Sequence, residues 1–382
     1  MTAPADFLRL RDQAAAAPQP GIDPDRPCWI FGAGNFGRSL AGALQAQGTT
    51  IAGFVETAPR TAAVQGLPVL DWNTLARQEP QAQLALGIFN RDTPFDQLLA
   101  LPAATGLNRP LMPWTLYGPL AQTLGWRFWL SPRALLLDGM PRIAQAAERL
   151  ADAESVRTLY RICAFRLGLD MGYASFQSTE RQYFNALTLP TLQGRAITYV
   201  DCGAYDGDSF SDLLAQPGIA CAQAFLLEPD PANYARLAQR AAAHAGTDTQ
   251  AICLPLAAAQ AHGSLTFQAG QGEACTVLKE GTKAGTGTTI TAVALDELLP
   301  GTPVHLLKLD IEGAEAPALR GARRLIQRGR PVLAVSLYHN PQDLWELPEL
   351  LFELCGEGYR FHIRQHGFNS FESVLYAVPQ NF

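Results

Sequence analysis

A strand, a glycine-rich turn and a helical stretch follow one another twice in this chain, and this pattern constrains the fold more than any other feature. The first copy is residues 28–31, the turn Gly32-Ala33-Gly34-Asn35-Phe36-Gly37 and a helical stretch to about residue 47. The second is residues 197–202, the turn Gly203-Ala204-Tyr205-Asp206-Gly207 and another helical stretch. Strands that alternate with helices form mostly parallel sheets with right-handed crossovers. The sequence therefore predicts an α/β protein with two Rossmann-like sheets.

The chain is too long for one domain of ordinary size. Its 382 residues divide by pattern into three parts. Residues 1–110 carry one compact βαβ unit, which we expect to form a smaller Rossmann-like domain of the nucleotide-binding type. Residues 111–195 lack alternating strands and are rich in Leu, Ala and Arg at helical spacing, so we expect a helical connector. Residues 196–382 are expected to form the larger α/β domain.

The last two expected strands of the larger domain indicate its class. Residues 360–363 and 371–378 are joined by a loop too short for a parallel crossover, so the two strands should be antiparallel. A mostly parallel sheet that ends in an antiparallel hairpin is the arrangement expected of class I methyltransferases. Residues 263–268 and 288–293 are expected to add a further hairpin.

The second glycine-rich turn has the residue types of a site for S-adenosylmethionine. Gly203 and Gly207 let the backbone approach a ligand closely, and the following helix N-terminus suits a ligand carboxylate. Asp201 and Asp206 add acceptors for a cationic group. A pyrophosphate would be repelled by so many carboxylates. The alternative is a generic Asp/Gly turn of an α/β protein.

An acidic residue ends the next expected strand. Glu228 follows the apolar run Phe225-Leu226-Leu227, roughly 20 residues after the turn, and is followed by Pro229 and Asn233. A carboxylate at this place can accept two hydrogen bonds from a ribose diol. The alternative for Glu228 is a solvated strand end.

Charged residues interrupt the expected central strand. Residues 304–315 place Lys308, Asp310 and Glu312 at a spacing of two, which puts them on one face if the strand continues so far. Burying such charges costs several kcal/mol unless they are paired. The cluster either lies at the carboxyl edge of the sheet, where ligands of open α/β folds bind, or forms an internal Lys–carboxylate pair that only holds strands together.

These motifs together resemble the FkbM family of methyltransferases. The residues that carry the resemblance are the turn after Asp201, the Glu228-Pro229 step with Asn233, the Lys308–Glu315 run, and the segments around residues 338–348, 372–377 and 180–184. The resemblance implies a class I methyltransferase fold over about residues 175–380, S-adenosylmethionine as donor and O-methylation of a hydroxyl, with sugars or polyketide alcohols as frequent acceptors. It adds Tyr183 to the expected cofactor site, whose members are Asp201, Gly203, Ala204, Tyr205, Asp206, Gly207, Glu228, Pro229, Asn233 and Tyr183.

An alcohol acceptor must lose a proton during methylation, so a general base is expected. The candidates are His339, just after the fifth strand, and Asp310 or Glu312, with Lys308 beside them. His339 is favoured because the ordinary pKa of histidine lies near neutral pH; the alternative is a capped loop histidine. Asp310 and Glu312 could instead hold a divalent ion, but no third ligand is evident and we expect no metal.

The first turn carries a dinucleotide fingerprint in its proper context. Gly32, Gly34 and Gly37 lie between a strand and a helix, and Glu56 ends the next strand. This predicts a second nucleotide site at Gly32, Gly34, Asn35, Phe36, Gly37 and Glu56. The surroundings resemble N-terminal domains of acyltransferases that modify nucleotide sugars, which implies a nucleotide or nucleotide-sugar ligand or an empty scaffold. An NAD-dependent sugar oxidoreductase and a nucleotide-binding sensor are the competing functions; the chain has no Tyr-x-x-x-Lys dyad for the former.

Composition excludes several other classes of protein. The net charge is −6 without a basic stripe, so we expect no nucleic-acid partner. The seven cysteines are scattered and never spaced as Cys-x-x-Cys, which is typical of neither a disulfide framework nor a zinc site. No apolar run approaches the roughly 18 residues of a membrane span, and we expect a reduced, cytoplasmic compartment. The acceptor and the oligomeric state are not indicated.

Overall fold

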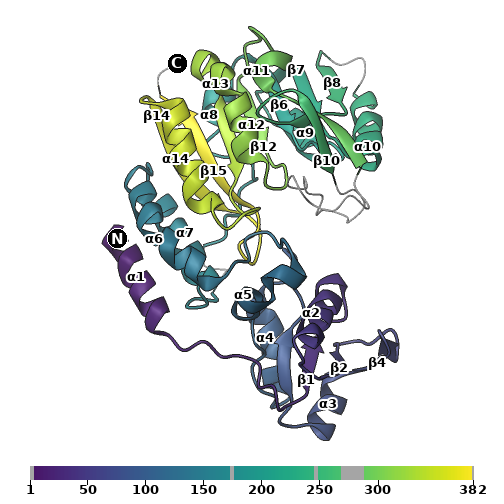
Figure 1. Ribbon diagram of the computed structural model, residues 1–382. Coiled ribbons are helices and arrows are strands. Elements are labelled where there is room, and N and C mark those ends of the chain that lie inside the picture. The colour runs from purple at the N-terminus through teal and green to yellow at the C-terminus, as the bar shows by residue number, and fades with distance from the viewer. Residues whose placement is uncertain (1–3, 173–175, 245–247, 268–287, 381–382) are drawn as a thin grey trace.

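The computed structural model describes residues 4–172, 176–244, 248–267 and 288–380. The chain forms a smaller α/β part and a larger α/β part, with helices between them (Figure 1). Hydrophobic residues gather into separate cores, one in the smaller part and two on the faces of the larger sheet. The fold is the α/β architecture that the sequence predicts.

The smaller part is built on a five-stranded sheet in the order β3-β4-β2-β1-β5. Strand β1 pairs in parallel with β2 and with β5, and β4 pairs in parallel with β2. All four residues of β1 are buried, as expected for a central strand covered on both faces. Its elements are β1 (Cys28–Phe31), α2 (Asn35–Ala46), β2 (Ile51–Val55), β3 (Ala63–Val64), β4 (Leu67–Leu70), α3 (Trp72–Gln78), β5 (Gln83–Leu86), α4 (Phe95–Ala104) and α5 (Pro113–Leu124).

Helices connect the two α/β parts. They are α1 (Pro4–Ala16), α6 (Arg133–Glu148), α7 (Ala153–Arg166) and α8 (Leu189–Leu192). Helix α1 comes before β1 in the sequence but packs on α6, where Phe7 and Leu10 join the core of the larger part (Figure 1). Helix α7 packs along β14, and Ala151 N, just before this helix, donates to Phe361 O at 2.8 Å.

The larger part is built on a seven-stranded sheet in the order β14-β15-β13-β12-β6-β7-β8. Strand β15 is antiparallel to both β13 and β14, and the other pairs are parallel. This confirms the predicted class I methyltransferase sheet with an antiparallel terminal hairpin. The strands are β6 (Ala196–Cys202), β7 (Ala220–Leu227), β8 (Gln250–Leu254), β12 (Leu306–Leu309), β13 (Val332–Ser336), β14 (Tyr359–Gln365) and β15 (Ser373–Pro379).

Helices cover both faces of this sheet and a small sheet lies at its edge. The helices are α9 (Asp208–Leu214), α10 (Pro231–Ala242), α11 (Leu295–Leu298), α12 (Glu315–Gly321), α13 (Arg323–Gly329) and α14 (Asp343–Cys355). The small sheet contains β9 (Ala257–Ala258), β10 (Gly263–Phe267) and β11 (Thr288–Val293). Strands β10 and β11 are antiparallel, as expected of the extra hairpin; its predicted end, Gln268, lies outside the described residues.

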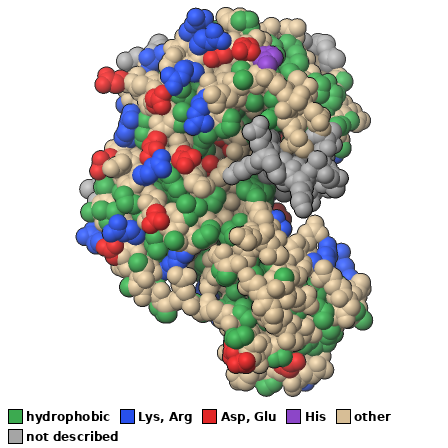
Figure 2. Space-filling model, in the orientation of Figure 1, with side chains coloured by type: hydrophobic (Ala, Val, Ile, Leu, Met, Phe, Trp, Pro, Cys, Tyr) green, Lys and Arg blue, Asp and Glu red, His purple; other side chains and the backbone are tan. Residues whose placement is uncertain are grey.

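Two further properties concern the surface and the helices. Among the described side chains on the face in Figure 2, Lys and Arg alternate with Asp and Glu rather than forming a stripe. No helix within the described ranges is long and apolar enough to cross a bilayer.

Candidate active site

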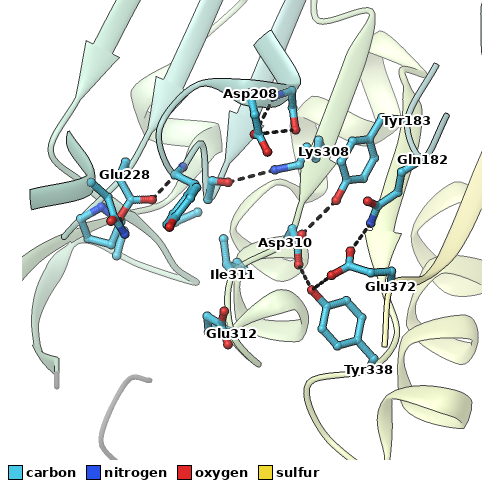
Figure 3. A pocket seen from close by; sticks show the side chains of 18 of the residues that line it. Gln182, Tyr183, Asp208, Glu228, Lys308, Asp310, Ile311, Glu312, Tyr338 and Glu372 are labelled. Carbon is cyan, nitrogen blue, oxygen red and sulfur yellow. Dashed lines mark hydrogen bonds between the residues drawn. The ribbon is translucent and has the colours of Figure 1, made fainter. Parts of the chain in front are cut away.

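A pocket of about 440 Å³ opens at the carboxyl edge of the larger sheet. The ends of β6, β7 and β12 meet there, as expected for ligand sites in open α/β folds. Its volume is that of an ordinary small-molecule site. Figure 3 shows Glu228 on one side and Tyr338 and Glu372 on the other, with Lys308 and Asp310 between them. The predicted residues that line it are Tyr183, Gly203, Tyr205, Glu228, Pro229, Asn233, Lys308, Asp310 and Glu312.

Lys308, which lines the pocket, forms a buried ion pair with Asp201, which does not line it. Lys308 Nζ lies 2.7 Å from Asp201 Oδ1 and donates to Gly203 O at 2.9 Å. Tyr199 Oη donates to the other carboxylate oxygen of Asp201 at 2.8 Å. Burial opposes the charge on Lys308, but Asp201 and Asp310 outweigh it and hold the lysine pKa above its usual value. The internal pair that the sequence left open as an alternative is thus present.

Four of the predicted cofactor residues, Asp201, Ala204, Asp206 and Gly207, do not line the pocket. Asp201 is fully buried by its ion pair, and Asp206 is paired with Arg240 at 2.6 Å. Gly207 takes a φ of 86° to begin α9, and the side chain of Ala204 is in the core. These residues shape the turn, and its contact surface comes from Gly203 and Tyr205.

The packing of the chain requires a glycine at position 203. Its φ is 79°, and a Cβ atom there would lie 1.9 Å from Asp310 O. The turn therefore presses against the end of β12 and brings Asp310 beside it. A substitution would strain the backbone and displace this strand end.

Glu228 is held at the end of β7 by backbone donors. Tyr205 N and Asp230 N each donate to one of its carboxylate oxygens at 2.9 Å, and Asn233 Nδ2 lies 3.5 Å away. The side chain is 5% exposed and lines the pocket. Burial raises its pKa to about 7 despite these donors. A carboxylate has about four lone-pair positions, so these three donors leave at least one for a ligand.

An apolar wall that the sequence did not indicate also lines the pocket. It is formed by Leu256, Ala257, Ala258 and Ile290, which come from β9, β11 and the segment before β9. These are ordinary apolar residues in short strands. No motif distinguishes them from core residues, so only the fold reveals them.

Asp310 lies at the centre of the other half of the pocket. Tyr183 Oη donates to its Oδ2 at 2.9 Å, and Tyr338 Oη donates to its Oδ1 at 3.0 Å (Figure 3). Burial alone would raise the pKa of Asp310, but His339 and Lys308 nearby lower it below its usual range. Asp310 is therefore a stable anion and a hydrogen-bond acceptor.

Glu312 has a different environment from Asp310. Strand β12 ends at Leu309, before both Asp310 and Glu312, so the expected continuation of one strand face does not occur; Glu312 has a left-handed φ of 55°. Glu312 lines the pocket, and burial raises its pKa to about 8. Its Oε2 has no hydrogen-bond partner among the described residues. A strained, poorly solvated carboxyl of this kind is typical of a functional group.

His339, the favoured base, lies behind the pocket and not in its lining. Its side chain is fully buried, with Nδ1 2.8 Å from Glu315 Oε1 and Nε2 3.3 Å from Asp310 Oδ1 and 3.8 Å from Glu312 Oε2. Burial would lower its pKa, but Glu315 and Glu312 raise it to about 10. The carboxylates around it favour an imidazolium, which does not accept a proton, so the structure favours another residue as the base.

Besides Tyr338, three polar residues of this half were not assigned to the site from the sequence. Glu372 accepts from Gln182 Nε2 at 2.7 Å, and its Oε1 lies 3.4 Å from Tyr338 Oη. Arg91, from the loop after β5 in the smaller part, forms an ion pair with Glu372. All three residues line the pocket. Arg91 and Glu372 lie 281 positions apart in the sequence, so no motif spacing relates them.

The first glycine-rich turn has the expected shape. Gly32 has a φ of 100°, and a Cβ on Gly37 would lie 1.9 Å from Gly32 O, so both glycines are needed by the chain. Gly34 has an ordinary φ of −70° and no atom within 4 Å of its ideal Cβ position. Glu56 Oε1 accepts from Ala33 N at 3.1 Å. Asn35 begins α2, and Phe36 packs against Phe89 with 5.5 Å between ring centroids.

The larger part defines a class I methyltransferase fold with a ligand pocket at its carboxyl edge. Residues 201–361 match the model of the methyltransferase FkbM domain. Residues 201–361 therefore contain a methyltransferase FkbM domain, as the predicted resemblance implies. No curated protein sequence is significantly similar to this chain.

The likeness to a solved structure extends over both α/β parts. The crystal structure of methyltransferase FkbM from Methylobacillus flagellatus KT superposes with a TM-score of 0.73 at 21% identity, covering 98% of each chain. At this identity the likeness shows the fold alone. A precorrin-6y C5,15-methyltransferase from Geobacter metallireducens GS-15 aligns at a TM-score of only 0.30 and 13% identity, over 53% of this chain and 93% of that one, and supports no argument.

Proposed function

We propose that the protein transfers a methyl group from S-adenosylmethionine to a hydroxyl of a sugar, glycan or related small molecule. The observation that carries this proposal is one pocket with two different carboxyl groups. Glu228 is held by backbone donors at the end of β7, and Glu312 lies across the pocket with a raised pKa. The first is suited to hold a nucleoside and the second to accept a proton.

The residues present fit a sulfonium nucleoside in the half near Glu228. The Glu228 carboxylate would accept from the ribose hydroxyls, and the apolar wall of Leu256, Ala257, Ala258 and Ile290 would cover the adenine. The turn at Gly203 and Tyr205, together with Asp208, would lie beside the methionine end. When bound, this group supplies a methyl carbon activated by its positive sulfur.

The charge of the lining agrees with a cationic donor. Among the described residues, six acidic side chains line the pocket, together with the cations Arg91 and Lys308, each of which is paired with a carboxylate. Asp310 stays ionised among them, and its negative charge in a poorly solvated pocket favours positive ligands and repels a pyrophosphate. The acidic residues are Asp208, Asp212, Glu228, Asp310, Glu312 and Glu372.

The other half of the pocket is suited to bind and deprotonate a hydroxyl. Asp310 stays ionised and offers oxygens to an acceptor hydroxyl, with Tyr183 and Tyr338 fixing its orientation. Glu312, whose pKa is about 8, takes the proton. A base with a pKa near the working pH contributes typically 10²–10⁴-fold to the rate. The remaining acceleration comes from aligning acceptor and donor.

Calorimetry with S-adenosylmethionine and with NAD tests the donor. We expect S-adenosylmethionine to bind and Glu228→Ala to weaken it by about tenfold or more, since hydrogen bonds to a charged group contribute about 1.5–3 kcal/mol. Glu353, exposed on α14, provides the control variant Glu353→Ala. Unchanged affinity in Glu228→Ala would contradict the assignment.

Incubation with methyl-labelled donor and extracted cell glycans tests the acceptor class. We expect label in the glycan fraction and its retention through mild base, which cleaves methyl esters but leaves ethers intact. Label that is lost in mild base would exclude a hydroxyl acceptor.

One observation also favours a nucleotide or nucleotide sugar at the smaller part. Gly32 and Gly37 are explained by close packing of the chain, whereas nothing in the chain requires a glycine at Gly34. In dinucleotide sites a glycine at this place allows close approach of a pyrophosphate. This second site is independent of methyl transfer, and calorimetry with nucleotides tests it separately.

A further inference from the structure

Arg91 is the residue through which the smaller α/β part reaches the methyltransferase pocket. It lies between β5 and α4, in the loop at the carboxyl edge of the smaller sheet. The rest of the pocket lining, from Gln182 onward, comes from residues after the helices α6 and α7. The pocket is therefore completed by a residue from a different sheet.

The loop that carries Arg91 is fastened to the larger part by one buried side chain. Asn369 Nδ2 donates to Asn90 O at 2.8 Å and to Thr93 O at 2.7 Å, and Asn369 Oδ1 accepts from Phe95 N at 3.0 Å. Asn369 is fully buried and has a left-handed φ of 55°. These bonds flank Arg91 on both sides, so they fix the position of its backbone.

Aromatic rings also pack where the loop that carries Arg91 meets the larger part. Phe89, two residues before Arg91, packs on Phe371 with 5.0 Å between ring centroids, and Phe128 packs on Phe371 at 5.1 Å. Trp126 Nε1 donates to His339 O at 3.0 Å. A side chain held between such contacts is preorganised and loses little freedom when it meets a ligand.

The side chain of Arg91 stands beside the groups that face the acceptor. It pairs with Glu372, which also contacts Gln182 and Tyr338, and Tyr338 in turn donates to Asp310. About a third of the Arg91 side chain, 36%, remains exposed, and it contributes surface to the pocket. A guanidinium beside a carboxylate offers fixed donors next to acceptors, which matches neighbouring hydroxyl groups.

We infer that Arg91 is a specificity-determining residue for the acceptor, by which the smaller part takes part in substrate selection. This inference rests on the proposed function. It assigns the donor to the half of the pocket near Glu228 and the acceptor to the half shared by Arg91, Glu372 and Asp310. The smaller part then contributes to catalysis without any ligand of its own.

The test compares variants of the full-length chain with S-adenosylmethionine and with the extracted glycan fraction as acceptor probe. Arg91→Ala should lower kcat/KM for the acceptor by about tenfold or more, mainly through KM, and change the donor Kd less than about threefold. Arg91→Lys keeps the charge beside Glu372 but loses the guanidinium fork, and should recover only part of the activity. Arg77→Ala, an exposed arginine on α3, is the matched control.

A second variant tests the loop without altering the pocket lining. Asn369→Gly removes the three anchoring hydrogen bonds and tolerates the left-handed φ. We expect a loss of acceptor kcat/KM in this variant and a smaller effect of Arg91→Ala in its background, because the two changes act on one contact.

The outcomes separate this inference from the function on which it rests. Equal acceptor kcat/KM in Arg91→Ala and Arg77→Ala, with methyl transfer intact, would overturn the inference alone. A parallel loss of donor affinity in Arg91→Ala would also overturn it, because the residue would then belong to the donor half. Absence of methyl transfer in the unaltered protein would contradict the proposed function and the inference together.

Discussion

Lys308 Nζ and Asp201 Oδ1 lie 2.7 Å apart, and neither side chain is more than 3% exposed. The pair joins β12 to β6, two adjacent strands, and Lys308 also holds Gly203 O. It therefore fixes the glycine turn on which the pocket depends, although Asp201 does not line the pocket.

Breaking this pair from one side should destabilise the fold. Lys308→Met or Asp201→Asn alone should lower the free energy of unfolding by about 3–5 kcal/mol, because each leaves a buried charge without its partner. The double variant should recover a large part of that loss. Urea-induced unfolding measures all three; single variants that cost less than about 1 kcal/mol would show that the pair is solvated.

Glu228 is expected to bind the donor at a cost in stability. Its pKa is about 7 in the folded protein against 4.5 ordinarily, so its protonated form is favoured by folding. The contribution of Glu228 to the free energy of unfolding is therefore most favourable below pH 4.5. It falls by up to about 3 kcal/mol as the pH rises through 7. Glu228→Gln should therefore unfold at higher temperature than the unaltered protein at pH 8, and similarly at pH 4.

The same variant should bind the donor more weakly. Calorimetry of Glu228→Gln with S-adenosylmethionine at pH 8 gives the affinity, and thermal unfolding gives the stability. A variant that is less stable at pH 8 would indicate that Glu228 is a structural anchor for Tyr205 and Asp230.

The fold and the place of Glu228 at a strand end could be predicted because both depend on local patterns. The strand–turn–helix order predicts the parallel sheet. The short link between the last two strands predicts that they pair antiparallel, as β14 and β15 do. The position of Glu228 at the edge of the sheet follows from its place directly after an apolar strand. These features need only neighbouring residues, or strands whose order the topology rules restrict.

The roles within the site could not be predicted because they depend on distant partners. The usual pKa of histidine made His339 a candidate base from the sequence. In the structure, Glu315 and Asp310 lie beside its buried ring and favour the cation. Arg91 enters the site from another sheet, and no pattern relates it to Glu372. Burial and charge partners decide a pKa, and neither is visible along the chain.

Gly34 provides a test of the nucleotide prediction for the smaller part. Its backbone is ordinary and its surroundings are open, so Gly34→Leu should leave the thermal unfolding temperature within about 2 °C. The same variant should abolish binding of NAD or a nucleotide sugar, because the side chain fills the space of the pyrophosphate. Calorimetry with both ligands provides the measurement. If neither ligand binds the unaltered protein, the turn has only a structural role and the nucleotide prediction is wrong.

The pH dependence of methyl transfer should report Glu312. A base acts only when deprotonated, so kcat/KM should rise about tenfold per pH unit below a pKa near 8 and level off above it. Glu312→Gln should lower the rate by about 10²–10⁴-fold and remove this dependence, while Glu353→Gln on exposed α14 should change neither. A profile that is flat from pH 6 to 9 in the unaltered protein would exclude Glu312 as the base.

His339 should shift this profile without being its source. The imidazolium lies 3.8 Å from Glu312 Oε2 and lowers the pKa of that carboxyl. Removing the positive charge in His339→Gln should therefore raise the pKa of Glu312 and move the rising limb of kcat/KM to higher pH, with activity recovered in alkaline buffer. The charge of His339 is itself favoured by folding up to a pKa of about 10, so the variant should lose stability at neutral pH. If His339 were the base, the limb would vanish and alkaline pH would restore nothing.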